Sequence, residues 1–422
     1  MTISPTASPA DLSASAARRA MREGHLTALD LTRACLARIA ARDNAVRAWI
    51  TLNPRAEAEA AAIAPDDPRP LAGIPVAIKD VIDTVDLPTT NNSPLCGTNR
   101  PGLDAPVVQI LRAAGAIVLG KTDTTEFAAC GRDAATGNPH DTARTPGGSS
   151  SGSAAAVADF QCPIGIGTQT GGSTIRPASF CGIPALKPSW GLISTEGVRR
   201  YAVSFDTIGL FVRDPEDLDL LADVFALPPA PPVAAGRLRL GVTLTPYADH
   251  LEPEARHLFA GLAARLAPVA DLVPVDLPEG AADLDHLHRC IQHCEGASAF
   301  LNLSRTQGTL LHREFHDRIE HRTGFTQRQH FEAYDRLAQL RLGVEAQLAQ
   351  VDALIAPSAP GFAPLGRGPG NPLFNALWTA LQLPVMNVPV PGHDLPLGLS
   401  LIVRRAFDRQ LPDLARRLLA AL

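Results

Sequence analysis

Two clusters rich in glycine and hydroxyl side chains lie close together in the chain. The first covers residues 146–153 (PGGSSSGS) and the second covers residues 167–177 (GTQTGGSTIRP). Glycine lets backbone N–H groups approach a ligand closely, and successive N–H groups in a tight turn form a concavity that attracts negative charge. The clusters therefore predict one shared pocket, with serine hydroxyls as candidate nucleophiles and backbone N–H groups as candidate donors to an oxyanion.

Lysine is the residue type that could activate such a serine, and this chain has almost none. The 38 basic residues include three lysines, Lys79, Lys121 and Lys187, all in or near the region of the clusters. Arginine keeps its proton in a protein, whereas a desolvated lysine can lose it. Lys79 ends an apolar stretch, the position at which pocket residues commonly lie. A base at the pocket and an ordinary packing role both remain open for each lysine.

Other motifs in the chain are weaker. Residues 148–152 match G-x-S-x-G, but that motif requires a buried strand before it, and residues 140–146 are polar and end in proline. No lysine follows either cluster at the spacing of a phosphate-binding loop. Residues 286–294 hold three histidines and two cysteines without a second ligand pair elsewhere. We interpret them as solvated histidines beside buried cysteines, and we expect no metal.

The elements around the clusters alternate between apolar strands and helices. Alternation of this kind is typical of an α/β protein with helices on the faces of a sheet. Strands are expected at 46–52, 71–80, 116–119, 163–167, 238–242, 272–274, 353–356, 385–388 and 398–403, and helices at 9–22, 27–43, 55–63, 151–159, 215–227, 253–266, much of 280–350, and 407–422.

Length and composition exclude several classes of protein. The chain has 422 residues, 45% hydrophobic composition and a formal net charge of −5. It has no basic block, so nucleic acid is not expected as a partner, and no apolar run long enough to span a bilayer. We see no leader sequence. Seven scattered cysteines suit a reducing compartment, so we expect a cytoplasmic protein.

Several segments together resemble the amidase signature family. They are residues 78–80 (IKD), 147–158, 167–173, 181–188, 205–209 and 356–361. The resemblance covers nearly the whole chain and is strongest for the short malonamidase-type members. It implies one large domain over residues 1–422 with a central mixed β-sheet covered by helices on both faces. The signature core would span about 65–215, and a C-terminal part, about 236–422, would complete the sheet and the substrate pocket.

The resemblance also implies roles for individual residues. The family's Ser-cisSer-Lys triad maps onto Ser173 as nucleophile, Ser149 as the bridging serine in a cis peptide, and Lys79 as base. The oxyanion hole maps onto the backbone of residues 170–173, which are Thr170, Gly171, Gly172 and Ser173. Arg176 matches the arginine that holds a substrate carboxylate in malonamidase-like enzymes. A structural role for Arg176, paired with a carboxylate of the protein, remains open.

The implied function is hydrolysis of the C–N amide bond of a small, carboxylate-bearing amide through an acyl-enzyme, with release of ammonia. No cofactor is implied, and the expected partners are a small-molecule amide and a second copy of the chain, with no nucleic acid and no membrane. The alternatives are the A subunit of a tRNA-dependent glutamine amidotransferase, although such proteins tend to be longer, and a hydrolase of ureido or biuret-type amides. A non-catalytic binding protein with a relic site is a further alternative.

Overall fold

The apolar runs of the sequence form the strands of a single large sheet. The computed structural model describes residues 8–422. Within them the strands are β1 (Trp49–Leu52), β2 (Pro75–Lys79), β3 (Ile117–Thr122), β4 (Ile164–Gln169), β5 (Ala185–Lys187), β6 (Thr207–Phe211), β7 (Leu238–Val242), β8 (Ala270–Pro274), β9 (Ala353–Pro357), β10 (Val385–Val390) and β11 (Leu397–Ile402).

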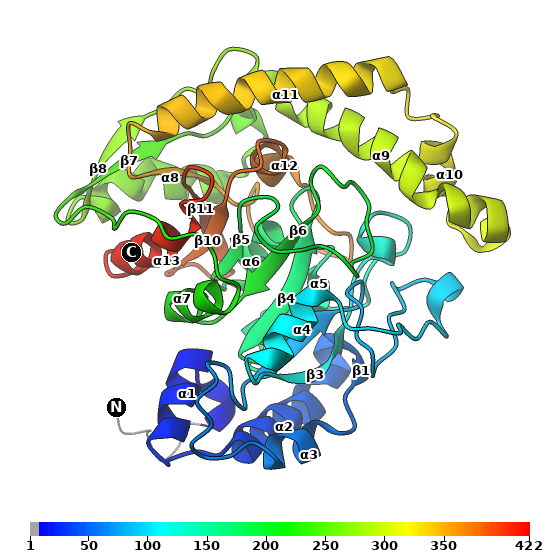
Figure 1. Cartoon of the computed structure of the whole chain (residues 1–422). Helices are drawn as coiled ribbons and strands as arrows, with labels where there is room; N and C mark the ends of the chain where they lie inside the picture. The colour runs from blue at the N-terminus through cyan, green and yellow to red at the C-terminus, as the bar shows by residue number, and fades with distance from the viewer. Residues whose placement is uncertain (1–7) are drawn as a thin grey trace.

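These eleven strands are hydrogen-bonded in the order β1-β3-β2-β4-β6-β5-β10-β11-β9-β7-β8 (Figure 1). The sheet is mixed. Strand β2 runs parallel to both β3 and β4, and β7 runs parallel to β8 and β9, whereas the strands between these groups pair antiparallel. Every residue of β2, β3, β4 and β11 is buried. Continuous apolar runs of this kind are typical of strands covered on both faces.

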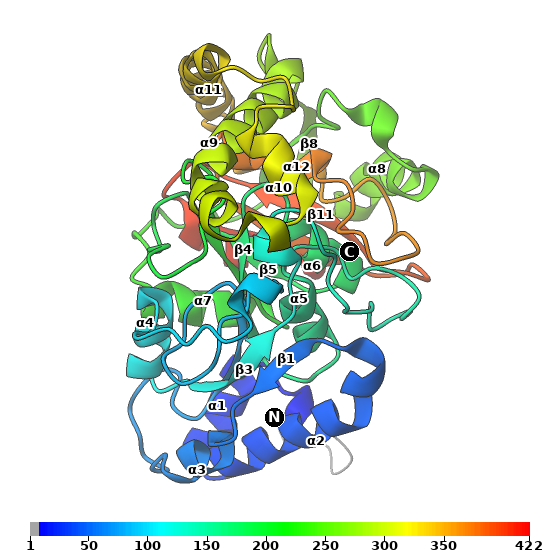
Figure 2. The same cartoon turned by 90° about the vertical axis from the view of Figure 1, so that its right-hand side faces the viewer.

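Thirteen α-helices lie among the described residues, and they cover the sheet in layers (Figures 1 and 2). They are α1 (Ala14–Arg22), α2 (Ala28–Val46), α3 (Ala56–Ala61), α4 (Pro106–Ala113), α5 (Ser151–Ala158), α6 (Ile175–Cys181), α7 (Pro215–Val224), α8 (Pro253–Leu266), α9 (Leu284–Gln307), α10 (Arg313–Ile319), α11 (Gln327–Leu348), α12 (Leu373–Ala380) and α13 (Leu411–Leu419).

Two groups of helices matter for the site. Helix α5 packs on strands β2, β3 and β4, and its neighbour α6 packs on β5, β10 and β11. Helices α10 and α11 both pack on α9, and α9 also contacts α12. The long helices α9 and α11 lie side by side above the end of the sheet in Figure 1. The segment 280–350, expected to be mostly helical, therefore forms a helical cover at this end of the sheet.

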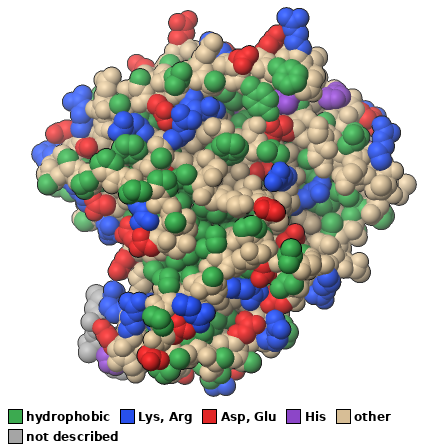
Figure 3. Space-filling view, in the orientation of Figure 1, with side chains coloured by type: hydrophobic (Ala, Val, Ile, Leu, Met, Phe, Trp, Pro, Cys, Tyr) green, Lys and Arg blue, Asp and Glu red, His purple; other side chains and the backbone are tan. Residues whose placement is uncertain are grey.

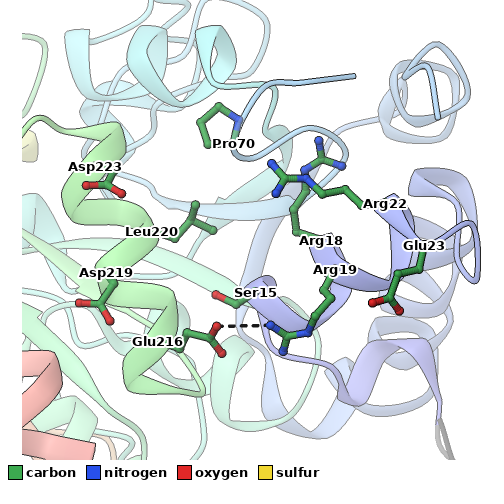
Figure 4. Close-up of a pocket in the computed structure, with 10 residues that line it drawn as sticks. All are labelled: Ser15, Arg18, Arg19, Arg22, Glu23, Pro70, Glu216, Asp219, Leu220 and Asp223. Carbon is green, nitrogen blue, oxygen red and sulfur yellow. Dashed lines mark hydrogen bonds and ion pairs between the residues drawn. The ribbon is translucent and has the colours of Figure 1, made fainter. Parts of the chain in front are cut away.

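The surface is mixed in charge. On the face in Figure 3, basic and acidic side chains are interspersed. A cavity of about 490 Å³ lies between α1 and α7, where Arg18, Arg19 and Arg22 face the acidic residues of α7, and Arg19 pairs with Glu216 (Figure 4). All seven cysteines are free thiols. Within residues 8–422, every helix is too short or too polar to cross a membrane.

Candidate active site

Lys79 is the last residue of β2, and its side chain is completely buried. Its Nζ lies 2.7 Å from Ser149 Oγ, 3.1 Å from Ser150 Oγ and 2.8 Å from Thr168 Oγ1. Because β2 pairs with β4, the lysine at the end of β2 lies beside the end of β4. Sheet pairing therefore brings together Lys79 and Thr168, residues 89 positions apart.

The surroundings of Lys79 favour a neutral amine. Burial lowers its pKa well below the usual 10.5, and the charge of Asp206 opposes this shift only in part. The Ser150 hydroxyl donates to the Thr168 carbonyl at 3.0 Å, so it meets the lysine as an acceptor. A neutral amine has two N–H donors and one lone pair. If the donors serve Ser150 and Thr168, the lone pair is left for the Ser149 hydroxyl.

The serines of the first cluster differ in their surroundings. Ser149 follows a cis peptide bond from Gly148 and lines a pocket of about 180 Å³. Ser151 begins helix α5, and Ser153 within that helix contacts the Thr122 hydroxyl and donates to the Ile166 carbonyl. Ser149 is therefore the serine of this cluster that joins the buried lysine to the pocket.

Ser173 lies in the loop between β4 and α6 and lines the same pocket as Ser149. Within residues 8–422, the N–H groups of Gly171, Gly172 and Ser173 donate to no protein acceptor. A hydroxyl and three unengaged N–H groups therefore share one small loop at the pocket. This arrangement can serve a nucleophile and an oxyanion, as electrostatic stabilisation of acyl transfer requires.

Arg176 is buried beneath this loop. Its Nε donates to the Pro369 carbonyl and its Nη2 to the Gly148 carbonyl, both at 2.6 Å. Its Nη1 is buried with no partner among residues 8–422, although Arg176 lines the pocket. Burial lowers the pKa of the guanidinium to about 9. Two nitrogens of Arg176 therefore bind carbonyls of the chain, and the third, Nη1, is left without a partner among the described residues.

One wall of the pocket consists of residues that the sequence did not indicate as part of a site. It comprises Asp285, His288, Arg289, Gln292 and His293 of α9, together with Arg318 of α10 and Tyr201. The α9 residues recur at the spacing of one helical face, a pattern visible in the sequence, although the sequence does not show what the face covers. The interpretation of solvated histidines is wrong for His288, which is buried and stacked on Phe205 with ring centroids 4.6 Å apart.

The other two lysines are also completely buried. Lys121 pairs with Asp80 at 3.1 Å and donates to the Thr89 hydroxyl at 2.7 Å. Lys187 donates to the Pro188 carbonyl, and burial lowers its pKa to about 7. Within residues 8–422, no three side chains of His, Cys, Asp or Glu form a metal-binding group.

Comparison with known proteins gives consistent matches over almost the full chain. A family model described as Amidase matches residues 30–411. The A subunit of glutamyl-tRNA(Gln) amidotransferase from Chloroflexus aurantiacus is 36% identical over 457 residues, covering 94% of this chain and 93% of the relative.

Two solved structures are similar throughout. One is a vestigial protein complex described as revealing the evolutionary origins of an s-triazine catabolic enzyme, with TM-score 0.86, 29% identity, and coverage of 97% of this chain and 98% of that chain. The other is peptide amidase from Stenotrophomonas maltophilia, with TM-score 0.82, 28% identity, and coverage of 97% and 96%. The mixed sheet and its helical layers, expected from the motifs, are therefore confirmed.

The expectation about partners is wrong. It named a small-molecule amide and a second copy of the chain, and it excluded nucleic acid. The relative from Chloroflexus aurantiacus carries the name of one subunit of an enzyme that is itself named for glutamyl-tRNA(Gln). Nucleic acid was excluded because the chain has no basic block. The charge of one chain indicates only what that chain attracts by itself, and not what an assembly containing it binds.

Proposed function

Because this chain belongs to the amidase family, we propose that it is the amide-cleaving A subunit of a glutamine amidotransferase and uses Ser173 as nucleophile. The observation that carries the chemistry is Lys79, a buried amine 2.7 Å from Ser149 at a pocket that Ser173 also lines. The choice of glutamine rests on the likeness to the amidotransferase chain from Chloroflexus aurantiacus, at 36% identity over 94% of this chain.

The first half of the proposed reaction forms an acyl-enzyme. Neutral Lys79 accepts the proton of the Ser149 hydroxyl, and Ser149 accepts the proton of Ser173. The loss of this proton turns the weakly nucleophilic Ser173 hydroxyl into an activated one, and Ser173 Oγ attacks the amide carbonyl. The developing oxyanion is stabilised by the N–H groups of residues 170–173, and each such donor contributes about 3 kcal/mol in comparable sites.

The second half releases the products. The C–N bond breaks and the leaving nitrogen takes a proton from Ser149, which Lys79 reprotonates, so that a primary amide yields ammonia. Water then enters, loses a proton through the same relay, and attacks the acyl carbon. The bond to Ser173 Oγ breaks, and Ser173 recovers a proton through Ser149 and Lys79, leaving a free carboxylic acid and an unmodified enzyme. In an amidotransferase the ammonia passes on to an acyl group held by the assembly.

The pocket favours a substrate with an anionic group. Three arginines line it, namely Arg176, Arg289 and Arg318, against one carboxylate, Asp285. Arg289 pairs with Asp285 at 2.8 Å, while Arg318 donates to the Tyr201 hydroxyl at 2.8 Å. Guanidinium groups bind carboxylates through paired hydrogen bonds. A substrate that carries a free carboxylate as well as the scissile amide, as glutamine does, suits this surplus of positive charge.

The direct test is ammonia release from L-glutamine by the purified chain, alone and after co-purification with its natural partners. Release from glutamine is expected, and Ser173→Ala should abolish it and also prevent labelling by a fluorophosphonate. Ser194→Ala is the matched control, because Ser194 is exposed on a surface loop. No release from glutamine in either preparation would refute the amidotransferase assignment.

A second candidate is hydrolysis of a ureido or biuret-type amide that carries a carboxylate. The likeness to the vestigial complex described as revealing the origins of an s-triazine catabolic enzyme, at TM-score 0.86 and 29% identity, supports it. The catalytic steps would be the same, and only the group beyond the scissile bond would differ. Biuret-type acids and malonamate therefore belong in the same assay, and a kcat/KM for one of them well above that for glutamine would select this candidate.

A further inference from the structure

The loop of the proposed oxyanion hole is held from behind by side chains of two distant helices. His288 Nε2 on α9 lies 2.8 Å from the Thr170 carbonyl oxygen. Thr379 Oγ1 on α12 lies 2.7 Å from the Gly171 carbonyl oxygen. The next carbonyl along, that of Gly172, accepts the N–H of Arg176 at 3.1 Å. Three consecutive carbonyls are therefore engaged, while the N–H groups that follow them are not.

This pattern fixes where the free N–H groups point. A trans peptide is planar, with its C=O and N–H directed oppositely, and Gly148–Ser149 is the cis bond recorded within residues 8–422. Holding the Thr170 carbonyl therefore aims the Gly171 N–H, and holding the Gly171 carbonyl aims the Gly172 N–H. Each hydrogen bond on the outer side of the loop sets the direction of a donor on its inner side.

The loop needs such anchoring because two of its residues are glycines. Glycine has more backbone freedom than any other residue, and a peptide between glycines can rotate unless its ends are held. Donors that already point at the oxyanion stabilise it without reorganising during the reaction. We propose that His288 and Thr379 are positioning residues that orient the oxyanion-hole N–H groups by hydrogen bonds to the carbonyls behind them; this inference rests on the proposed function.

Both side chains are suited to that task. His288 is buried, and its ring is stacked on Phe205, which fixes the plane of the ring. A carbonyl accepts only, so Nε2 carries the proton. Burial lowers the pKa of His288, so the neutral ring is favoured. Thr379 accepts a hydrogen bond from Gln169 Nε2 at 3.0 Å, and its own hydroxyl lies closer to the Gly171 carbonyl, at 2.7 Å, than to the Asn375 carbonyl, at 3.2 Å.

The test of His288 uses chemical rescue. His288→Ala is expected to lower kcat by about tenfold to 100-fold, with KM nearly unchanged, because the lost interaction matters most in the transition state. His288 lines the pocket, so imidazole can enter the space that the substitution leaves. Imidazole, which has an N–H, should restore kcat, whereas 1-methylimidazole, which has none, should not. Equal restoration by both, or a variant with wild-type kcat, would overturn the role of His288.

His286→Ala is the matched control on the same helix, since His286 is exposed and does not line the pocket. If His288→Ala fails to fold, Thr379 supplies an independent test. Thr379→Val should lower kcat, and Thr379→Ser, which keeps the hydroxyl, should restore it; the same kcat in both would overturn the proposal. Ammonia release that depends on Ser173 tests the proposed function separately, so a failure of one is distinguishable from a failure of the other.

Discussion

Gly171 and Gly172 are neighbours in one loop, but the structure predicts opposite outcomes when each is replaced by alanine. A methyl group on Gly172 would lie 2.8 Å from Arg176 Nη1 and 3.0 Å from Asn375 Cβ. A methyl group on Gly171 would meet nothing closer than 3.6 Å. Neither glycine has a positive φ, so the backbone itself allows alanine at both positions. The difference is entirely one of space.

The neighbours of Gly172 cannot move aside easily. The guanidinium of Arg176 is planar, and its nitrogens other than Nη1 donate to the Pro369 and Gly148 carbonyls. Asn375 is held by a hydrogen bond to the Ser358 carbonyl at 2.9 Å. To reach 3.4 Å, the lower end of ordinary contact, Nη1 must move by about 0.6 Å. Overpacking of this kind typically costs about 1–3 kcal/mol.

Urea unfolding followed by tryptophan fluorescence measures this difference. Trp378 is completely buried on α12, the helix that carries Asn375, and so reports on the affected region. Gly172→Ala should lower the free energy of unfolding by about 1–3 kcal/mol and reduce the rate of fluorophosphonate labelling. Gly171→Ala should unfold at the same urea concentration as the wild type or slightly higher, while its methyl group, next to the pocket, raises KM. Equal stability of both variants would refute the reasoning.

Three further predictions concern charged groups. Because burial lowers the pKa of Lys79 below 10.5 and the neutral amine is the base, kcat/KM should rise with pH through that lowered pKa, and Lys79→Met should abolish this limb of a pH–rate profile. Lys187 has a pKa of about 7 in the folded chain against 10.5 ordinarily, so the unfolded chain holds more protons between those values and stability rises with pH. Lys187→Met should remove this rise, which is worth at most about 3 kcal/mol between pH 7 and pH 9, as measured by urea unfolding at those two pH values. An unchanged difference between the two would contradict the assignment. Arg176→Met should lower the ratio of kcat/KM for a carboxylated amide over its neutral analogue by about tenfold to 100-fold, and equal losses for both substrates would limit Arg176 to its contacts with Gly148 and Pro369.

The sequence predicts elements that have a local signature. Helix α8 occupies the expected residues, 253–266, because a proline in the first turn marks its start. Strands β2 and β4 were expected from apolar runs bounded by turn residues, and the structure has them at nearly the same positions. The expected helix over residues 9–22 begins only at Ala14, after a short 3-10 turn, because Ser13 caps the helix at that point.

Elements without such a signature were missed. Helix α6 starts two residues after Ser173 and has Pro177 in its first turn, so its seven residues looked like a continuation of the glycine-rich cluster. Strand β5 has three residues, too few for any periodicity. Helix α12 lies between the expected strands at 353–356 and 385–388, where no helix was expected. All three become ordered through packing against distant parts of the chain, which local sequence does not record.

The residues of the candidate site also differ in whether a local sequence motif indicates them. Lys79, Ser149 and Ser173 belong to motifs, and the first two prove to be in contact. The roles of Arg176 and His288 depend on partners far away in the sequence. Arg176 binds the carbonyl of Pro369, 193 residues later, and His288 reaches Thr170, 118 residues earlier. Such contacts follow from how distant segments of the chain pack together, which no spacing along the chain reveals.

The burial of Lys79, Lys121 and Lys187 has a practical consequence, because these are all the lysines of the chain and each is fully buried. An ε-amine can react with an acylating reagent only when the core that contains it opens. The rate of lysine acylation in the native protein therefore measures local opening of the folded chain rather than the chemistry of its surface. Mass spectrometry of the acylated chain would then report, lysine by lysine, how often the core around each amine opens, and for Lys79 that core is the candidate active site.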